Sequence, residues 1–125
     1  MTVYRDLIVW RRALDLAHAT YGLARRLPTE EAWGLRGQLT RAVVSVAANI
    51  AEGWTRESVR ERANFLSIAQ GSLAETDTLL VICEEAGLLT RSQTEEARAH
   101  MEEVGKMLST LRKRLREKIG AGRKS

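Results

Sequence analysis

The stretch from Arg41 to Gly53 constrains the fold most, because it has the pattern of a helix that is apolar around most of its circumference. At about 100° per residue only a narrow seam of this helix is polar, whereas an ordinary surface helix has a wide polar face. Such a helix must be covered on most sides, either by its own domain or by a second chain. The polar seam consists of Gln38, Arg41, Ser45, Asn49 and Glu52.

The polar seam predicts a network of hydrogen bonds. Ser45 and Asn49 lie one turn apart and can bond to each other, and Arg41 can meet a carboxylate such as Glu52. This network is either a binding site or a device that fixes how bundles pack together. We favour the second, because buried polar residues on helices often specify register or oligomeric state. No His or Cys lies near the seam in sequence, so we expect no activated nucleophile, no cofactor and no enzyme activity.

Apolar residues recur three and four positions apart along most of the chain, which predicts an all-α protein. One proline and nine glycines are too few for a sandwich of many short strands. The spacing predicts four helices, over about residues 6–27, 35–52, 58–86 and from 90 onward. Four long helices with short connections form an antiparallel up-and-down four-helix bundle. We expect one bundle domain over residues 1–119 and a flexible basic tail over residues 120–125.

The first predicted helix carries two apolar stripes. We expect the longer stripe to face the core and the shorter one to broaden the buried face beyond a two-stranded seam. The longer stripe is Leu7, Trp10, Leu14, Ala17, Tyr21 and Ala24, and the shorter one is Ala13, Leu16, Leu23 and Leu27, interrupted by Thr20.

Local signals mark the ends of the other helices. Gly53 is suited to a left-handed residue that stops the second helix. Ser58 and Glu61 form a capping-box pattern that begins the third, which continues to the residue before Gly87. The fourth helix can begin at either of two further capping boxes, Thr90 with Gln93 or Ser92 with Glu95.

Two motifs carry a resemblance to a known family. The first is Gln38-Leu39-x-Arg41-Ala42-x-x-Ser45-Val46-x-x-Asn49-Ile50-Ala51-Glu52-Gly53, and the second is Phe65-Leu66-x-Ile68-Ala69-x-Gly71-Ser72-Leu73-x-Glu75, with Arg56 between them. Together they resemble the bacterial four-helix-bundle family of 23S rRNA intervening-sequence proteins, from Trp10 to about Leu89. That family is similar to the accessory variability determinant proteins of diversity-generating retroelements, which are bundles that assemble as pentamers and bind nucleic acid. The resemblance therefore implies a ring-shaped homo-oligomer, a pentamer, and brings no catalytic residues with it.

The resemblance and the charges also imply a role for Glu75, which we expect to pair with Arg41 or Arg56. Glu75 shares a helix face with Gly71 and Ser72. A glycine in the middle of a long helix lowers the stability of the helix by about 1 kcal/mol relative to alanine, so we expect another contact at Gly71 to offset this cost. A ligand or a neighbouring helix that approaches closely would do so, and we expect the helix, because this part of the chain is rich in small residues.

The positive charge of the chain is concentrated at its C-terminal end. The net charge is +4, with +2 over residues 1–57, −3 over 58–89 and +5 over 90–125. Cations at the end of a helix stabilise it and keep a protein in solution, but seven of them against one acid, Glu117, exceed that need. No aromatic residue lies between them, so we expect contacts to phosphates rather than stacking on bases. The candidate nucleic-acid contacts are Arg112, Lys113, Arg114, Arg116, Lys118, Arg123 and Lys124, with Arg36 and Arg56 as further candidates.

The two histidines have carboxylates at helical spacing, which permits a metal-ligand cluster. Asp15 precedes His18 by three residues, and Glu96 and Glu103 flank His100. Such pairs are common on solvated helix faces and neither histidine has a second one nearby, so we expect no metal site.

The single cysteine and the absence of long apolar runs indicate where the protein is found. Cys83 follows an apolar run, which predicts a small core residue, and one cysteine excludes an intrachain disulfide. No apolar run approaches the length of about 20 residues that spans a bilayer, and the first residues lack a signal-peptide pattern. We expect a cytoplasmic protein that does not enter membranes.

Together these observations predict a non-catalytic, oligomeric helical bundle that binds RNA or DNA through basic surface with little sequence preference, as an accessory factor. Assembly would multiply a weak basic patch into useful avidity. The alternative is a protein-interaction scaffold whose ring docks a partner such as a reverse transcriptase or a ribosome-associated factor.

Overall fold

The computed structural model describes residues 3–31 and 34–124, with side chains to residue 122. Its four α-helices are α1 (Ile8–Ala24), α2 (Leu35–Trp54), α3 (Val59–Glu85) and α4 (Arg91–Lys124). Two short 3-10 helices, η1 (Tyr4–Asp6) and η2 (Thr29–Glu31), precede α1 and α2. No strand occurs in the described residues, which confirms the predicted all-α class.

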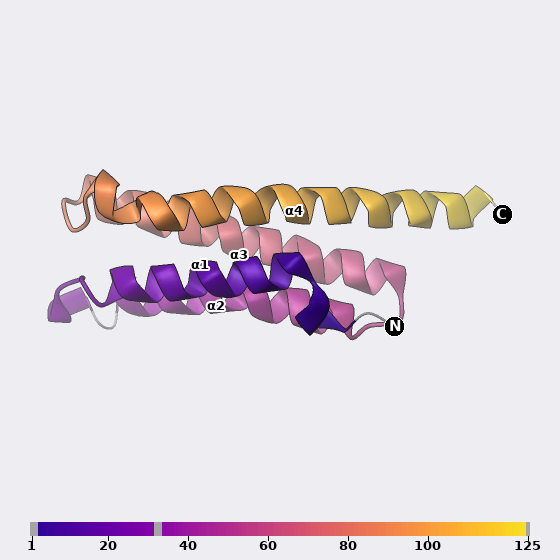
Figure 1. Cartoon of the computed structure of the whole chain (residues 1–125), viewed down its shortest axis with the longest axis horizontal. Coiled ribbons are helices and arrows are strands. Elements are labelled where there is room, and N and C mark those ends of the chain that lie inside the picture. The colour runs from indigo at the N-terminus through magenta and orange to yellow at the C-terminus, as the bar shows by residue number, and fades with distance from the viewer. Residues whose placement is uncertain (1–2, 32–33, 125) are drawn as a thin grey trace.

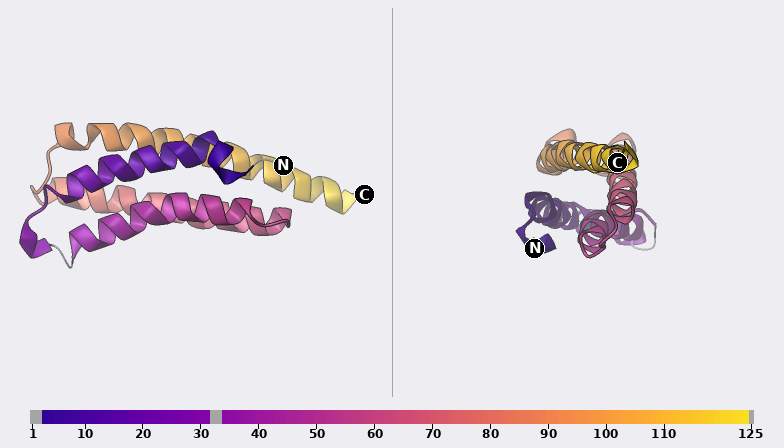
Figure 2. Two further views of the ribbon diagram at one scale, coloured as in Figure 1. Left: turned by 60° about the horizontal axis from the view of Figure 1, so that its bottom comes forward. Right: turned by 90° about the vertical axis from the view of Figure 1, so that its right-hand side faces the viewer.

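Each helix packs on two others, and the four contacts form a closed cycle. α2 contacts α1 and α3, and α4 contacts α3 and α1, whereas the diagonal pairs are farther apart. The chain doubles back at each connection, so that both termini lie at the same end of the molecule (Figure 1). α4 is the longest helix and its C-terminal end projects beyond the other three (Figures 1 and 2).

The core fills the space between the helices in two clusters along the bundle. One surrounds Leu16, Leu39 and Leu80, and the other surrounds Ile50, Leu66 and Leu108. On α4, Ala97, Met101, Val104, Leu108 and Leu115 are buried, and Leu111 is half-buried. This continuous burial on all four helices is the main source of stability, since apolar area removed from water contributes about 25 cal/mol per Å².

The buried face of α1 differs from the predicted one. Ala13, Leu16 and Leu23 of the shorter stripe are buried, together with Thr20, which interrupts that stripe in the sequence. The longer stripe lies mostly at the edge of the core, and Tyr21 is 41% exposed. The shorter stripe is central because α1 is contacted by both α2 and α4, and small side chains such as Ala13 let these neighbours approach.

Three of the predicted helix ends are confirmed. The Ser58 hydroxyl accepts a hydrogen bond from the Glu61 amide at 3.3 Å, and Gly87 adopts a φ of +77° after α3. Of the two possible capping boxes before α4, the first one forms. The Thr90 hydroxyl accepts from the Gln93 amide at 3.1 Å, and the Gln93 side chain accepts from the Thr90 amide at 2.9 Å.

The prediction for Gly53 is wrong. Gly53 lies inside α2, which continues to Trp54, and its backbone is not left-handed. A Cβ atom at this position would lie 2.8 Å from the Cβ of Phe65 on α3. The glycine therefore allows close packing of α2 on α3 rather than ending the helix. At the other end of the chain, α4 continues to Lys124 through the segment from residue 120 that the sequence predicted as a flexible tail.

Candidate nucleic-acid interface

The centre of the polar seam forms a hydrogen-bonded network between α2 and α3. The hydroxyl groups of Ser45 and Ser72 lie 2.8 Å apart. The Asn49 side chain donates to the Ser45 carbonyl at 2.8 Å and to the Ser45 hydroxyl at 2.9 Å. All three side chains are half-buried, so the network satisfies polar groups at the edge of the core. Sequence reasoning found Ser45 and Asn49 as partners but did not assign Ser72 to the network.

The outer members of the seam do not join this network. Glu52 pairs with Arg56 at 3.4 Å, one turn along the chain, and both side chains are partly exposed. Arg41 and Glu75 are exposed, and neither has an ion-pair partner in the described part of the chain. The pairing of Glu75 with Arg41 or Arg56 is therefore not formed within the subunit.

Gly71 lies in the middle of α3 with open space around it. A Cβ atom placed there would meet no atom within 4 Å. In the part of the chain that the structure describes, no other helix therefore approaches Gly71 closely, unlike the situation at Gly53. The neighbouring helix that the sequence predicted at Gly71 is not found among the described residues.

The predicted cations lie in the C-terminal half of α4, where Leu115 is still buried against the bundle. Lys113, Arg114, Arg116 and Lys118 are exposed. Within the described residues none of the four has an ion-pair partner, so their charges face solvent. Arg123 and Lys124 belong to α4, but their side chains lie outside the described residues.

The first cation of this group holds α4 against α3. The Arg112 guanidinium donates to the side-chain carbonyl of Gln70, and the Gln70 amide donates to the Ser109 hydroxyl at 3.0 Å. Leu115 is buried between the free cations and anchors the same stretch of helix. The cationic surface is thus fixed to the bundle by Arg112 and Leu115 rather than carried on an independent segment.

The two further candidates, Arg36 and Arg56, make intramolecular contacts. Arg36 donates to the carbonyls of Ala24 and Leu27 at 3.0 and 2.7 Å, and so satisfies carbonyl groups at the end of α1. Arg56 lies over the Phe65 ring at 5.0 Å in addition to its ion pair with Glu52. These contacts leave both guanidinium groups less available for phosphate than the cations of α4.

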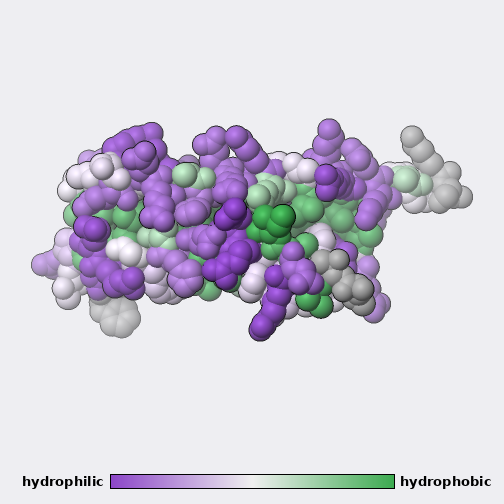
Figure 3. Space-filling model, in the orientation of Figure 1, coloured by the Kyte–Doolittle hydropathy of each residue, from purple (hydrophilic) through white to green (hydrophobic). Residues whose placement is uncertain are grey.

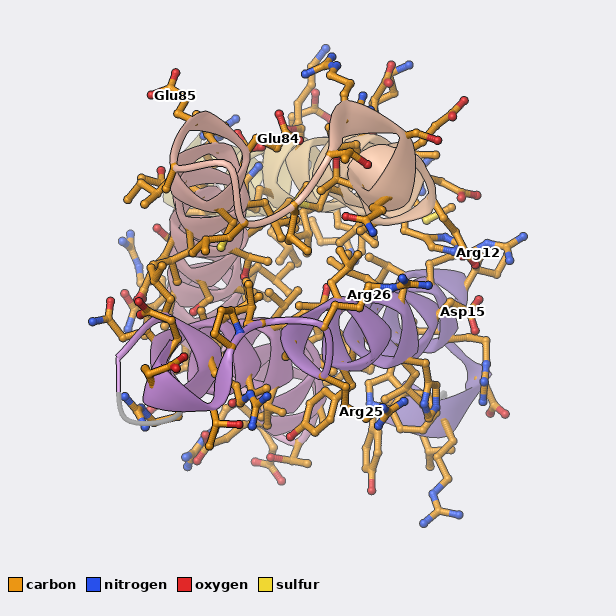
Figure 4. The ribbon with its side chains drawn as sticks, turned by 90° about the vertical axis from the view of Figure 1, so that its left-hand side faces the viewer. Arg12, Asp15, Arg25, Arg26, Glu84 and Glu85 are labelled. Atoms are coloured by element: carbon orange, nitrogen blue, oxygen red, sulfur yellow. The ribbon has the colours of Figure 1, made fainter. Side chains whose placement is uncertain are left out.

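A polar cluster that the sequence did not predict joins α3 to α4 at the opposite end of the bundle. The Thr94 hydroxyl, which is fully buried, donates to the Glu84 carboxylate at 2.5 Å. Arg91 and Arg98 each approach the same carboxylate at 3.7 Å. Glu84 turns toward α4 whereas Glu85 points away from the bundle (Figure 4). Adjacent glutamates look alike in sequence, and which one is enclosed depends on the face of α3 against which α4 packs.

The two histidines line one groove of about 600 Å³ between α1 and α4. His18 and His100 share this groove with Asp15 and Glu96, although the spacing placed each histidine only beside carboxylates of its own helix. Asp15 is held by Arg11 and by Arg12 at 3.3 and 3.4 Å, and Glu96 lies 3.7 Å from His100. Among the described residues no three His, Cys, Asp or Glu side chains are grouped so that they could hold a metal ion.

Two other predictions concern the core and the membrane. Cys83 is fully buried, as predicted, and burial, with a smaller contribution from the negative charges of Glu31 and Glu84, raises the pKa of its thiol. No helix among the described residues is both long and apolar enough to cross a membrane.

Comparison with known proteins agrees with this fold. The sequence model of the family described as 23S rRNA-intervening sequence protein matches residues 5–110. The structure is similar to the crystal structure of a protein of unknown function from the S23 ribosomal protein family of Bacteroides thetaiotaomicron. The TM-score is 0.78 and the identity 27%, over 85% of this chain and 99% of that one. No curated protein matches the chain.

Proposed function

This chain belongs to the family of 23S rRNA-intervening sequence proteins, and from that premise we propose that it is a non-catalytic homo-oligomer that binds the phosphate backbone of RNA or DNA. Its building block is an antiparallel up-and-down bundle, and its binding surface is the cationic end of α4. The resemblance to accessory variability determinant proteins supports a ring of five subunits that acts in the cytoplasm as an accessory factor.

The observation that carries the proposal is the C-terminal half of α4 with four exposed cations, Lys113, Arg114, Arg116 and Lys118, which have no ion-pair partner in the described part of the chain. Cations that are already paired with carboxylates gain little from a phosphate, whereas these can exchange solvent and counterions for phosphate oxygens. Because no aromatic side chain lies among them, the surface favours charge over base identity.

Assembly into an oligomer would strengthen nucleic-acid binding, because it links several weak binding sites. A few phosphate contacts per subunit give weak binding, but copies that are held together bind with a much higher effective concentration. Self-association is favoured by the exposed apolar side chains that the subunit leaves uncovered, among them Ile8, Ile68 and Ile82.

Binding to labelled structured RNA and duplex DNA, measured by fluorescence anisotropy over a range of salt concentrations, tests this proposal. Charge reversal at two free cations, Lys113→Glu with Arg116→Glu, should weaken binding to all sequences alike. It should also flatten the dependence of log K on log salt, by about 0.9 for each duplex phosphate that the variant no longer neutralises.

The matched control is Arg25→Glu with Arg26→Glu, which makes the same change in charge just after α1, at the opposite end of the bundle from the cations of α4. Both arginines are exposed and have no ion-pair partner in the described part of the chain. Equally weakened binding in both double variants would point to net charge rather than to α4. No binding at low salt would overturn the proposal and favour the alternative, a scaffold that docks a protein such as a reverse transcriptase or a ribosome-associated factor.

A further inference from the structure

Charged side chains are sorted along the length of the bundle. The two core clusters divide it into a terminal half, at the end where both termini lie, and a connecting half, which includes the α1–α2 and α3–α4 connections (Figure 1). The terminal half comprises residues 3–15, 46–69 and 102–124, and the connecting half comprises residues 16–31, 34–45 and 70–101. The terminal half contains fourteen Lys and Arg against eight Asp and Glu, a net charge of +6, whereas the connecting half contains six against eight, a net charge of −2. The field of the subunit therefore favours the approach of a nucleic acid to the terminal half, where α3 begins and α4 ends.

A groove of about 390 Å³ opens in the terminal half between the start of α3 and the end of α4, and we call it the Arg60–Lys118 groove. Its lining residues are Ser58, Val59, Arg60, Lys118, Ile119 and Gly122. Arg60 and Lys118 are exposed, and neither has an ion-pair partner in the described part of the chain. Val59 of α3 and Leu115 of α4 pack in the same core cluster, which holds the two sides of the groove together. Two available cations from different helices therefore border one groove.

Arg60 is the cation at the start of α3 that remains available. Arg56 lies over the Phe65 ring at 5.0 Å. Arg62 lies over the Trp54 ring at 4.7 Å and donates to the Arg56 carbonyl at 3.0 Å. Arg60 makes no such contact among the described residues, so its guanidinium can bind an anion without breaking a bond within the subunit.

No carboxylate lines the Arg60–Lys118 groove. The nearest acids in sequence are Glu57, Glu61 and Glu117, which are exposed. Within the described residues none of these acids forms an ion pair with Arg60 or Lys118. The charge that borders the groove itself is therefore positive from both sides, which suits an anionic ligand.

Two larger grooves are less suited to an anion. The groove of about 470 Å³ between the start of α1 and the C-terminal half of α4 is lined by Asp6 and by apolar side chains such as Leu7 and Ile8, and Figure 3 shows it as a hydrophobic area. The groove with the two histidines is lined by the carboxylates of Asp15 and Glu96. Carboxylates repel a phosphate, and apolar walls offer it no hydrogen bond.

We propose that a phosphate of the nucleic-acid backbone binds in the Arg60–Lys118 groove, between the two cations. The inference rests on the proposed function and extends its interface from α4 to the start of α3. A cation on each side of the phosphate donates charged hydrogen bonds to its oxygens. The Ser58 hydroxyl accepts from the Glu61 amide, and its own proton has no acceptor among the described residues, so it can donate a further bond. Because the ligand is the backbone, the groove holds RNA and DNA in place without reading their sequence.

The variant Arg60→Gln tests whether the start of α3 belongs to the interface. Its affinity for labelled structured RNA and duplex DNA is measured by fluorescence anisotropy over a range of salt concentrations. We expect binding about threefold or more weaker for all sequences alike, and a dependence of log K on log salt that is flatter by about 0.9 for a duplex. Arg25→Gln is the matched control, because Arg25 is an exposed arginine of the connecting half without an ion-pair partner in the described part of the chain, and it should bind like the wild type.

Three outcomes would contradict these expectations. Wild-type affinity in Arg60→Gln, together with weak binding in the double variant Lys113→Glu with Arg116→Glu, would overturn the inference and leave the proposed function standing. Equal weakening in Arg60→Gln and Arg25→Gln would also overturn it, because net charge rather than the groove would then be responsible. A wild-type chain that binds neither RNA nor DNA at low salt would instead overturn the proposed function itself.

A double-mutant cycle tests whether the two cations hold the same phosphate. Groups that act on one phosphate are coupled, so the loss of affinity in Arg60→Gln with Lys118→Gln should be smaller than the product of the two single losses. The control cycle combines Arg60→Gln with Lys113→Gln, because Lys113 does not line the groove, and there the losses should multiply. Losses that multiply for Arg60 and Lys118 as well would overturn the shared phosphate.

Discussion

The hydroxyl groups of Ser45 and Ser72 lie 2.8 Å apart and connect α2 to α3 at the edge of the core. Asn49 completes the connection from one turn further along α2 by donating to the Ser45 hydroxyl and to its carbonyl. The three side chains are linked by hydrogen bonds through the Ser45 hydroxyl. Removal of one side chain therefore leaves hydrogen-bonding groups of the others without a partner.

We therefore predict that Asn49→Leu destabilises the protein. Removal of the amide leaves the Ser45 carbonyl and hydroxyl without their donor, which should lower the free energy of unfolding by about 1–3 kcal/mol. Urea unfolding followed by circular dichroism measures the change. Ser67→Ala, at an exposed position of α3, is the control and should change stability by no more than about 0.5 kcal/mol. Equal midpoints for Asn49→Leu and wild type would contradict the role of the network.

Glycine-to-alanine substitutions should have opposite effects at two helical positions. A Cβ at Gly53 would lie 2.8 Å from the Cβ of Phe65, so Gly53→Ala forces α2 away from α3 and should cost about 1–3 kcal/mol. A Cβ at Gly22 would meet nothing within 4 Å, and there alanine should stabilise α1 by up to about 1 kcal/mol. Thermal unfolding of both variants at one protein concentration measures the difference. A gain in stability at Gly53 would show that the α2–α3 contact is looser than described.

Two buried threonines should respond differently to valine. The Thr20 hydroxyl is buried and has no hydrogen-bond partner among the described residues, so Thr20→Val should raise stability by about 1 kcal/mol. The Thr94 hydroxyl donates to Glu84, so Thr94→Val leaves a largely enclosed carboxylate without that donor and should lower stability by about 1–3 kcal/mol. Denaturant midpoints at neutral pH distinguish the two. The same sign for both substitutions would contradict this assignment of hydrogen bonds.

The buried thiol of Cys83 should make the free energy of unfolding decline at alkaline pH. Its pKa is raised in the folded protein, so below the ordinary thiol pKa of about 8.5 both folded and unfolded thiols are protonated and the full contribution is present. As the pH rises further, the unfolded thiol ionises first, and the contribution is lost up to the folded pKa. Unfolding free energies at pH 7.5 and 9.5 should therefore fall more for the wild type than for Cys83→Ala, which lacks the group. Parallel declines in both proteins would show that other groups are responsible.

The four helices and three of their ends could be predicted from the sequence because the signals for them are local. Apolar spacing marks the helices, and the capping residues Ser58 and Thr90 and the turn residue Gly87 act on neighbours in the chain. Gly53 was assigned wrongly because a glycine that ends a helix and one that admits a neighbouring helix look alike in sequence. The difference lies in Phe65 of α3, whose position depends on tertiary packing.

The candidate site could be predicted only in part for the same reason. The free cations of α4 follow from composition and position, but the contacts of Arg36 with the end of α1 depend on how two helices meet. Ser72 joins the seam only through the register of α2 against α3. The enclosure of Glu84 likewise depends on the face of α3 against which α4 packs, which a pair of adjacent glutamates does not reveal.

The cyclic packing order of the helices also determines how the chain folds. Three of the four helix contacts join elements that follow one another in sequence, and only the α1–α4 contact, which includes the 3.0 Å ion pair of Arg12 with Glu103, closes a long loop. Local contacts form quickly and long loops are entropically costly to close, so rapid folding is expected, with helical hairpins in the transition state and the α1–α4 contact formed last. Loosening that contact should accelerate unfolding while leaving the folding rate almost unchanged.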